Sequence, residues 1–150
     1  MRPPGNEVNM ATEPLLADSV VVIKSERRMI LYSQGRAFRI YNVAIGLDPV
    51  GPKMRQGDGR TPEGRYYIDY RKPDSFYYKA LHISYPNQED RERARAYGFS
   101  PGGGIMIHGV QPGAPYDHYA MTEGCIAVTN TEIEEIWALV PDHTPIEIRA

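Results

Sequence analysis

The chain has a single cysteine, Cys125, in the segment Thr122-Glu123-Gly124-Cys125. A glycine beside a nucleophile permits a tight turn and lets main-chain N–H groups approach a carbonyl oxygen, which is the geometry of an oxyanion hole. A lone cysteine is equally common as a small, buried apolar residue. Cys125 alone therefore leaves a catalytic and a structural interpretation open.

A second candidate, His108, closes the apolar run Ile105–His108 just before Gly109. A thiol with a pKa near 8.5 is only a few per cent ionised at neutral pH, and a neighbouring imidazole raises its nucleophilicity. A histidine that closes a strand is often structural and bonds a backbone carbonyl. The sequence thus predicts a Cys–His nucleophilic site only if the intervening loop brings both side chains together.

A zinc site is the rival interpretation, because the chain contains four histidines, His82, His108, His118 and His143. Their spacing does not match His-Glu-x-x-His, and one cysteine cannot build a cysteine-rich structural site. We therefore predict no metal and no organic cofactor. A non-catalytic binding module would need a cleft but no thiol, and this alternative stays open.

Length and charge exclude several classes of protein. A chain of 150 residues is long enough for one well-packed core. The net charge of −2 gives no field for nucleic acid, so we predict no nucleic-acid partner. No apolar run approaches the roughly 20 residues of a transmembrane segment. The N-terminus also lacks an apolar signal core, which predicts a cytosolic protein or an exported one whose leader is absent from this numbering.

The elements that must position these residues are mostly strands. Residues 1–18 are polar with three prolines and predict a flexible tail or linker, followed by one domain over 19–150. Between the early strands and the later ones, residues 47–64 form a long Gly- and Pro-rich loop, and loops of this length are usually functional or disordered. The predicted strands are Val20–Lys24, Met29–Tyr32 and Phe38–Ala44 as an antiparallel meander, then Arg65–Tyr70, Ala80–Ser84, Ile105–His108 and Pro145–Arg149.

Two helices complete the predicted fold. Thr129 and Glu132 have the spacing of a capping box, and the apolar stripe that follows has helical periodicity. The charged segment Asn87–Gly98 predicts a second helix that stops at its glycine. The fold class is therefore α/β but mostly β, a sheet or barrel with one or two packed helices.

The segments IMIHG and TEGCIAVTN, in this order and separated by a short spacer, resemble the catalytic signature of the L,D-transpeptidase catalytic domain family, also called YkuD-type. GRTPEGRYYI is similar to a second landmark of that family, and VVIKSERRMILYSQGR to its first hairpin. The likeness extends from Ser19 to Ala150. TEGCIAVTN followed by TEIEEIW resembles a Gram-negative subgroup in which some members hydrolyse murein-linked bonds.

The resemblance implies that Cys125 is the nucleophile and His108 the base, that Gly124 supplies oxyanion N–H groups together with Cys125, and that the carbonyl of Gly109 orients the imidazole. It implies acyl transfer at the bond between the L- and D-centres of peptidoglycan stem peptides. An amine acceptor would give a cross-link or an anchored protein, and water would give hydrolysis, including release of a murein-linked lipoprotein. The implied location is the periplasm or cell envelope.

Two residues depart from the family pattern. Glu123 stands where histidine is common, and Ala127 stands where Arg or Asn could grip a stem-peptide carboxylate. We expect substrate recognition to differ accordingly and hydrolysis to compete with transfer. The segment Val110–Ala120 is predicted to form a lid or cleft wall. The candidate substrate-binding residues are Thr122, Glu123, Tyr85, Tyr119 and Arg60.

Overall fold

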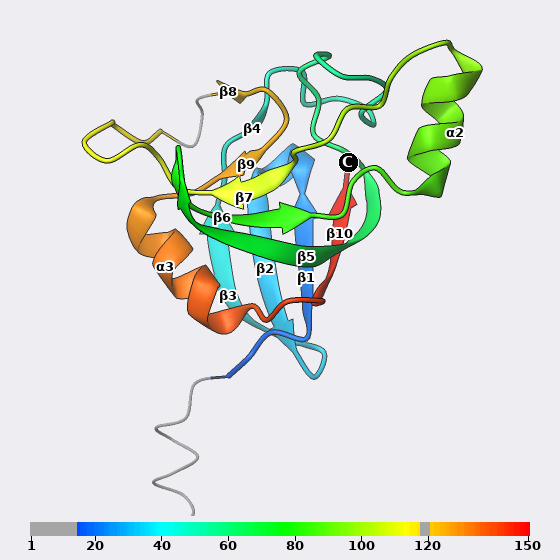
Figure 1. Ribbon diagram of the computed structural model, residues 1–150. Coiled ribbons are helices and arrows are strands. Elements are labelled where there is room, and N and C mark those ends of the chain that lie inside the picture. The colour runs from blue at the N-terminus through cyan, green and yellow to red at the C-terminus, as the bar shows by residue number, and fades with distance from the viewer. Residues whose placement is uncertain (1–14, 118–120) are drawn as a thin grey trace, which may run out of the picture.

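The computed structural model of the protein describes residues 15–117 and 121–150 (Figure 1). The predicted tail, residues 1–18, lies largely outside this range, so its conformation stays a prediction. The strands are β1 (Ser19–Ile23), β2 (Arg28–Ser33), β3 (Arg36–Asn42), β4 (Ile45–Gly46), β5 (Gly64–Ser75), β6 (Tyr78–Ile83), β7 (Met106–His108), β8 (Met121–Thr122), β9 (Ile126–Ala127) and β10 (Pro145–Arg149). The helices are the 3-10 turn η1 (Lys24–Glu26), α2 (Gln88–Ala96) and α3 (Asn130–Leu139).

One eight-stranded sheet, in the order β3-β2-β1-β10-β5-β6-β7-β9, carries the fold. β1, β2 and β3 form the predicted antiparallel meander, and the C-terminal β10 inserts beside β1 in parallel. Apolar residues on alternate positions of these strands face one core. The mostly-β class with packed helices is therefore confirmed.

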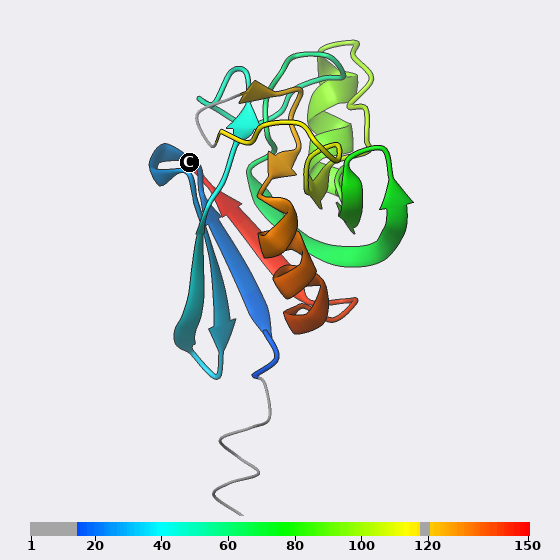
Figure 2. The ribbon, with the colours of Figure 1, turned by 90° about the vertical axis from the view of Figure 1, so that its left-hand side faces the viewer.

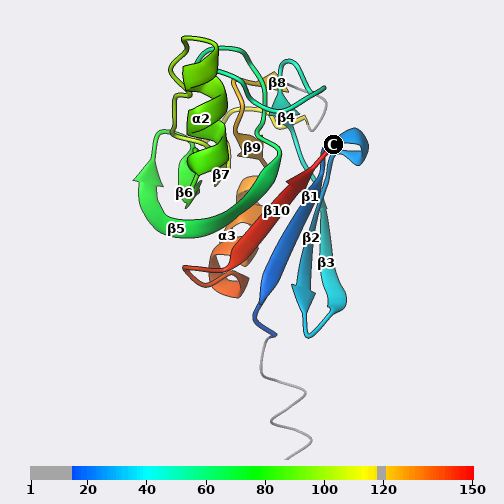
Figure 3. The same ribbon diagram turned by 90° about the vertical axis from the view of Figure 1, so that its right-hand side faces the viewer.

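β5 turns this sheet through a sharp bend. Its first residues pair with β10, and from Ile68 onward it pairs with β6, with register shifts between Ile68 and Tyr70 and between Lys72 and Ser75. Such irregularities increase local twist and bend a strand. Figures 2 and 3 show the result, two halves of the sheet folded toward each other. The predicted strand over Arg65–Tyr70 was too short, because the Lys-Pro-Asp that follows has the composition of a turn but continues the strand.

The two outer edges of the sheet meet and nearly close it into a barrel. Ala44, just beyond β3, forms an antiparallel bridge with Ala127 of β9, and each amide donates to the other's carbonyl at 2.9 Å. The short strands β4 and β8 pair in parallel beside this bridge. Strand β9, which directly follows Cys125, is thus held on one side by β7 and on the other by Ala44.

Helix α3 fills the angle between the two halves (Figure 2). Its predicted capping box is confirmed, with Thr129 and Glu132 bonding each other's backbone. Ile133 and Ile136 are fully buried in the core. On the outer side Glu135 accepts from the Tyr41 hydroxyl at 2.6 Å, which ties the helix to β3.

A buried lysine, Lys24, joins the start and the end of the long loop. The Lys24 ammonium, 2 % exposed, donates to the carbonyls of Gly51 at 2.8 Å and Thr61 at 2.7 Å and to the Glu63 carboxylate at 3.1 Å. Burial lowers the pKa of Lys24, and Glu63 opposes that shift. Because a buried ammonium needs several acceptors, the loop has to close around it.

Replacing Lys24 by methionine should lower the free energy of unfolding by about 2–4 kcal/mol, since two carbonyls and a partly buried carboxylate lose their partner. Urea unfolding monitored by circular dichroism measures the change. The matched control is Arg28→Ala, which breaks the ion pair between Arg28 and Glu26, whose side chains are 51 % and 52 % exposed. That control should stay within about 0.5 kcal/mol of wild type. Equal losses in both variants would contradict the anchoring role of Lys24.

Candidate functional site

The turn that carries the cysteine is held by the hydroxyl of Thr122. This oxygen accepts from the Gly124 amide at 3.0 Å and donates to the Cys125 carbonyl at 2.6 Å. Gly124 has a φ of +133°, and a Cβ there would lie 2.8 Å from the carbonyl oxygen of Arg60. Only glycine fits such a position, because both the backbone conformation and the available space exclude a side chain. The turn is therefore held by its own Thr122 hydroxyl and by close contact with the Arg60 carbonyl.

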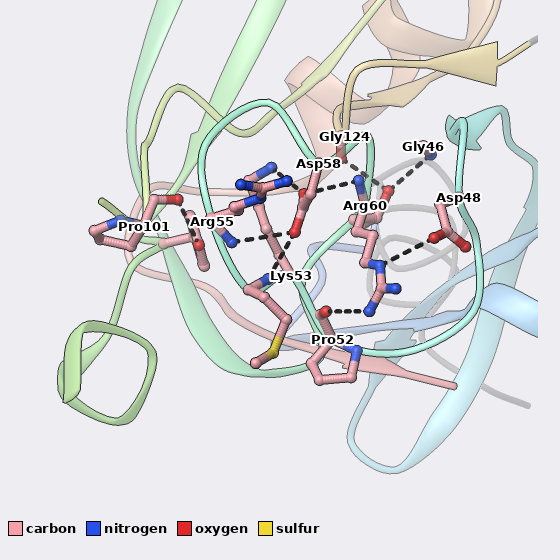
Figure 4. A network of polar contacts seen from close by, with 12 residues as sticks. Gly46, Asp48, Pro52, Lys53, Arg55, Asp58, Arg60, Pro101 and Gly124 are labelled. Atoms are coloured by element: carbon pink, nitrogen blue, oxygen red, sulfur yellow. Dashed lines mark hydrogen bonds and ion pairs between the residues drawn. The ribbon is translucent and has the colours of Figure 1, made fainter. Parts of the chain in front are cut away.

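The long loop forms the support behind this turn (Figure 4). The buried Thr61 hydroxyl donates to the Gly124 carbonyl at 2.8 Å and accepts from the Gly46 amide at 2.9 Å. Within the loop, the buried Lys53 ammonium pairs with Asp58 at 2.8 Å. The same carboxylate also accepts from the backbone amides of Met54, Arg55 and Arg60. Residues 47–64 thus form an ordered scaffold, although they contain no helix or strand before Gly64.

Strand pairing brings His108 and Cys125 to one face of the sheet. β7 and β9 pair in parallel, with Ile107 opposite Ile126 and His108 opposite Ala127. Both isoleucines are fully buried, so the alternate residues of the two strands face the other way. Extending the register by one places Cys125 beside Met106, and standard strand spacings then separate the Cα atoms of His108 and Cys125 by about 8 Å. The histidine and the cysteine are therefore diagonal neighbours.

The imidazole has a defined tautomer. His108 Nδ1 lies 2.6 Å from the Gly109 carbonyl oxygen, and because a carbonyl only accepts, Nδ1 must carry the proton. In the neutral ring Nε2 then holds a lone pair. A Cβ at Gly109 would lie 2.2 Å from Asn130 Oδ1, which accepts from the Val110 amide at 2.7 Å. Because Gly109 has no side chain, Asn130 at the start of α3 can approach and bond the Val110 amide. This contact fixes the backbone whose Gly109 carbonyl orients His108.

Burial keeps both reactive groups neutral in the resting chain. It lowers the pKa of His108, which is 7 % exposed, and the Gly109 carbonyl only partly opposes this. Burial also raises the pKa of the Cys125 thiol, against smaller lowering effects from the Met106 backbone and the Lys53 charge. Glu123 adds a small further rise. Both shifts favour thiol with imidazole over thiolate with imidazolium.

His108 and Cys125 line the same pocket, whose volume is about 470 Å³. The wall also includes the bridge residues Ala44 and Ala127 together with aromatic and carboxylate side chains. The described lining contains no lysine or arginine. Its remaining members are Tyr77, Gly109, Val110, Gln111, Ala114, Pro115, Tyr116, Asp117, Thr122 and Glu123.

The predicted substrate-binding residues divide into two groups. Thr122 and the exposed Glu123 line the pocket, whereas Arg60 and Tyr85 do not. Arg60 pairs with Asp48 at 3.1 Å. Tyr85 is buried, and its hydroxyl donates to the Pro101 carbonyl at 2.7 Å. Tyr119 lies outside the described residues.

Sequence reasoning missed two residues of the site. Tyr77 lines the pocket and stacks on the imidazole of His108, with ring centroids 4.5 Å apart and planes inclined by 19°. Thr61 lies in the segment GRTPEG, which was noted only as a landmark. Thr61 precedes Pro62 in the long loop, and this Thr-Pro pair was the signal in the sequence that could have identified it. Among residues 15–117 and 121–150, no three His, Cys, Asp or Glu side chains are placed to hold a metal ion.

Known proteins resemble this chain in both sequence and fold. Residues 17–148 match the family model described as the L,D-transpeptidase catalytic domain. YafK of Escherichia coli (strain K12), a protein provisionally called an L,D-transpeptidase, is 37 % identical over 127 residues. The aligned part covers 81 % of this chain and 46 % of YafK, so the chain spans about half the length of the curated relative it matches.

Solved structures give the same result. The helical cell shape determining protein Pgp2 from Campylobacter jejuni superposes with a TM-score of 0.67 and 25 % identity, over 97 % of this chain and 55 % of Pgp2. An L,D-transpeptidase from Xylanimonas cellulosilytica superposes with a TM-score of 0.63 over 98 % of this chain and 70 % of its own. At 16 % identity, this second likeness concerns the fold alone.

Alkylation of Cys125 by iodoacetamide should accelerate steadily as the pH rises, without a plateau at acidic pH. The raised pKa of the Cys125 thiol keeps the thiolate a minor species at neutral pH, and a neutral imidazole supplies no ion pair to preserve it at lower pH. Mass spectrometry of the modified protein gives the rate at each pH. A fast plateau below pH 6 would instead reveal a resting thiolate–imidazolium pair.

Thr61→Val should lower the free energy of unfolding by about 1–3 kcal/mol, because the isosteric side chain leaves the Gly46 amide and the Gly124 carbonyl without partners. Alkylation of Cys125 should change as well, since its turn loses the support of Thr61. Thr61→Ser keeps the hydroxyl and is the matched control. If valine and serine variants behaved alike in both measurements, the hydroxyl would not be the group that holds the turn.

Proposed function

The chain belongs to the L,D-transpeptidase catalytic domain family, and from this premise we propose that it is a cysteine acyltransferase acting on peptidoglycan stem peptides. The observation that carries the proposal is that the Cys125 thiol and the His108 imidazole, with Nδ1 committed to Gly109, line one pocket. The single-cysteine nucleophile needs no metal or organic cofactor for this chemistry.

The proposed first step is attack on the carbonyl carbon of an L–D peptide bond. Nε2 of His108 takes the thiol proton while the sulfur bonds to carbon, and the same nitrogen then gives that proton to the departing amine. The product is a thioester on Cys125. In the second step an incoming amine attacks the thioester, His108 takes the amine proton and passes it to the departing sulfur, and the Cys125 thiol is restored. A neutral resting pair suits this sequence, because proton transfer accompanies attack.

Backbone amides at the turn are the proposed oxyanion donors. The amide of Gly124 donates to Thr122 Oγ1 in the structure, so this hydroxyl would have to yield that bond when negative charge develops on the substrate. The absence of a side chain at Gly124 lets the turn pack directly against the Arg60 carbonyl, which fixes the direction of these amides. These features support acyl transfer by this turn and make Thr122 part of the proposed machinery.

The charged side chains of the pocket lining indicate which parts of a substrate could lie there. Asp117 and Glu123 are carboxylates in the described lining, and Ala127 leaves no cation at the position where the family often has arginine. A peptide carboxylate would find no guanidinium there, whereas an ammonium group would be attracted. We therefore propose that neutral or cationic parts of the stem peptide lie nearest to Cys125.

Hydrolysis of the same class of bond is the second candidate function, with water in place of the amine. It would release stem peptides or a murein-linked lipoprotein, and Ala127 favours it because an acceptor stem would lose a carboxylate grip at this position. A non-catalytic murein-binding module is a weaker alternative. All three would operate in the periplasm or cell envelope, where peptidoglycan lies. No described helix is long and apolar enough to cross a membrane.

Incubation of purified sacculi with the protein, followed by mass spectrometry of the muropeptides, tests the proposal. New cross-links indicate transfer, and released peptides or lipoprotein indicate hydrolysis. Cys125→Ala should reduce either change by at least about 1,000-fold, because no other group can form the thioester. Circular dichroism should show that this variant keeps the wild-type fold. Unchanged muropeptides with the wild-type protein would contradict both enzymatic functions, and an effect that survives Cys125→Ala would favour the binding module.

A further inference from the structure

The tip of the β5–β6 hairpin reaches the pocket through Tyr77. Its strands are fixed to the C-terminal part of α3 and to the residues that follow. Arg71 of β5 donates to the carbonyls of Trp137 at 2.8 Å and Val140 at 2.6 Å, and pairs with Asp142 at 2.8 Å. Because three bonds hold one guanidinium, the hairpin has a defined position relative to the helix.

The other strand of the hairpin is held in the same way. Lys79 Nζ donates to Glu134 at 2.6 Å, and the Tyr78 hydroxyl donates to the same carboxylate. Tyr78 has a φ of +78°, a left-handed conformation that is costly for a bulky residue. The tip therefore stores backbone strain at the point where its neighbour Tyr77 turns toward the histidine.

Two constraints act on the imidazole of His108. The hydrogen bond from Nδ1 to Gly109 fixes a direction within the ring plane, and the Tyr77 ring lies against one face at a centroid distance of 4.5 Å. Tyr77 is itself 47 % exposed, whereas His108 is 7 % exposed. The tyrosine thus stands between the imidazole and solvent. Together the two contacts leave Nε2 as the ring nitrogen available to the pocket.

We propose that Tyr77 is a positioning residue for His108, which holds the plane of the imidazole and excludes water from its face so that Nε2 stays directed at the pocket. This inference rests on the proposed function for its catalytic meaning. The geometric part, a tyrosine that orients and shields a buried histidine, does not depend on the substrate. Stacked aromatic pairs in this geometry are favourable beyond simple burial.

The charged and titratable groups around His108 determine how its protonation responds. Cys125, Tyr116, Asp117 and Glu123 line the pocket beside it, and Lys79 on the adjoining strand is paired with Glu134. Removal of the Tyr77 ring alters none of these groups but admits water to the imidazole. The pKa of His108 should then rise toward the ordinary value of 6.5, because hydration stabilises the charged form.

The test is an NMR titration of His108 in the full chain, with its signal assigned by comparison with His108→Gln. Tyr77→Leu should raise the pKa of His108, and Tyr77→Phe, which keeps the ring, should leave it unchanged. The matched control is Phe76→Leu, since Phe76 is 68 % exposed and packs edge-on against Tyr77. An unchanged titration in Tyr77→Leu, or an equal shift in Phe76→Leu, would overturn the proposal.

Turnover of sacculi supplies the second readout. Tyr77→Leu should lower the rate about 3- to 10-fold at the optimum. Activity requires neutral His108. The acidic limb of the pH–rate profile should therefore move to higher pH together with the pKa of His108. An acidic limb that stays in place while the titration shifts would overturn the positioning role. The titration needs no substrate, so sacculi left unchanged by the wild-type protein would contradict the proposed function without altering the NMR result.

Discussion

The buried ammonium of Lys24 is the constraint on which the site depends. An ammonium removed from water has to recover its hydrogen bonds, and here the carbonyls of Gly51 and Thr61 provide two of them. This requirement closes a loop of Gly and Pro residues that has no regular structure of its own. Thr61, held by its carbonyl, then uses its hydroxyl to support the carbonyl of Gly124. The position of the sulfur is thus linked to a lysine of the first turn after β1.

The second determinant is the parallel pairing of two very short strands. β7 and β9 contribute only a few residues, yet their alternation sends two isoleucines into the core and His108 and Cys125 into the pocket. The same burial that orders these strands keeps the thiol and the imidazole uncharged. The site therefore combines strict placement of the two side chains with a resting state in which both are neutral.

Much of this arrangement was predictable from the sequence, where the pattern was local. The capping box at Thr129, the terminal strand Pro145–Arg149 and the first meander depend on residues near in sequence, and the structure confirms them. The stack of Tyr77 on His108 and the bridge between Ala44 and Ala127 join distant segments, and no periodicity encodes them. Tyr85 shows the same limit, because the sequence predicted it as a substrate-binding residue, whereas its side chain is buried and its hydroxyl donates to the Pro101 carbonyl.

Gly124 and its neighbour Glu123 differ in the substitutions that each position can accept. Any side chain at position 124 would collide with the Arg60 carbonyl, whereas Glu123 projects to solvent with no such limit. Selection can therefore exchange the charge at the mouth of the pocket in a single substitution without displacing the sulfur. The charge beside the sulfur is therefore open to substitution, whereas the backbone that carries the sulfur is not.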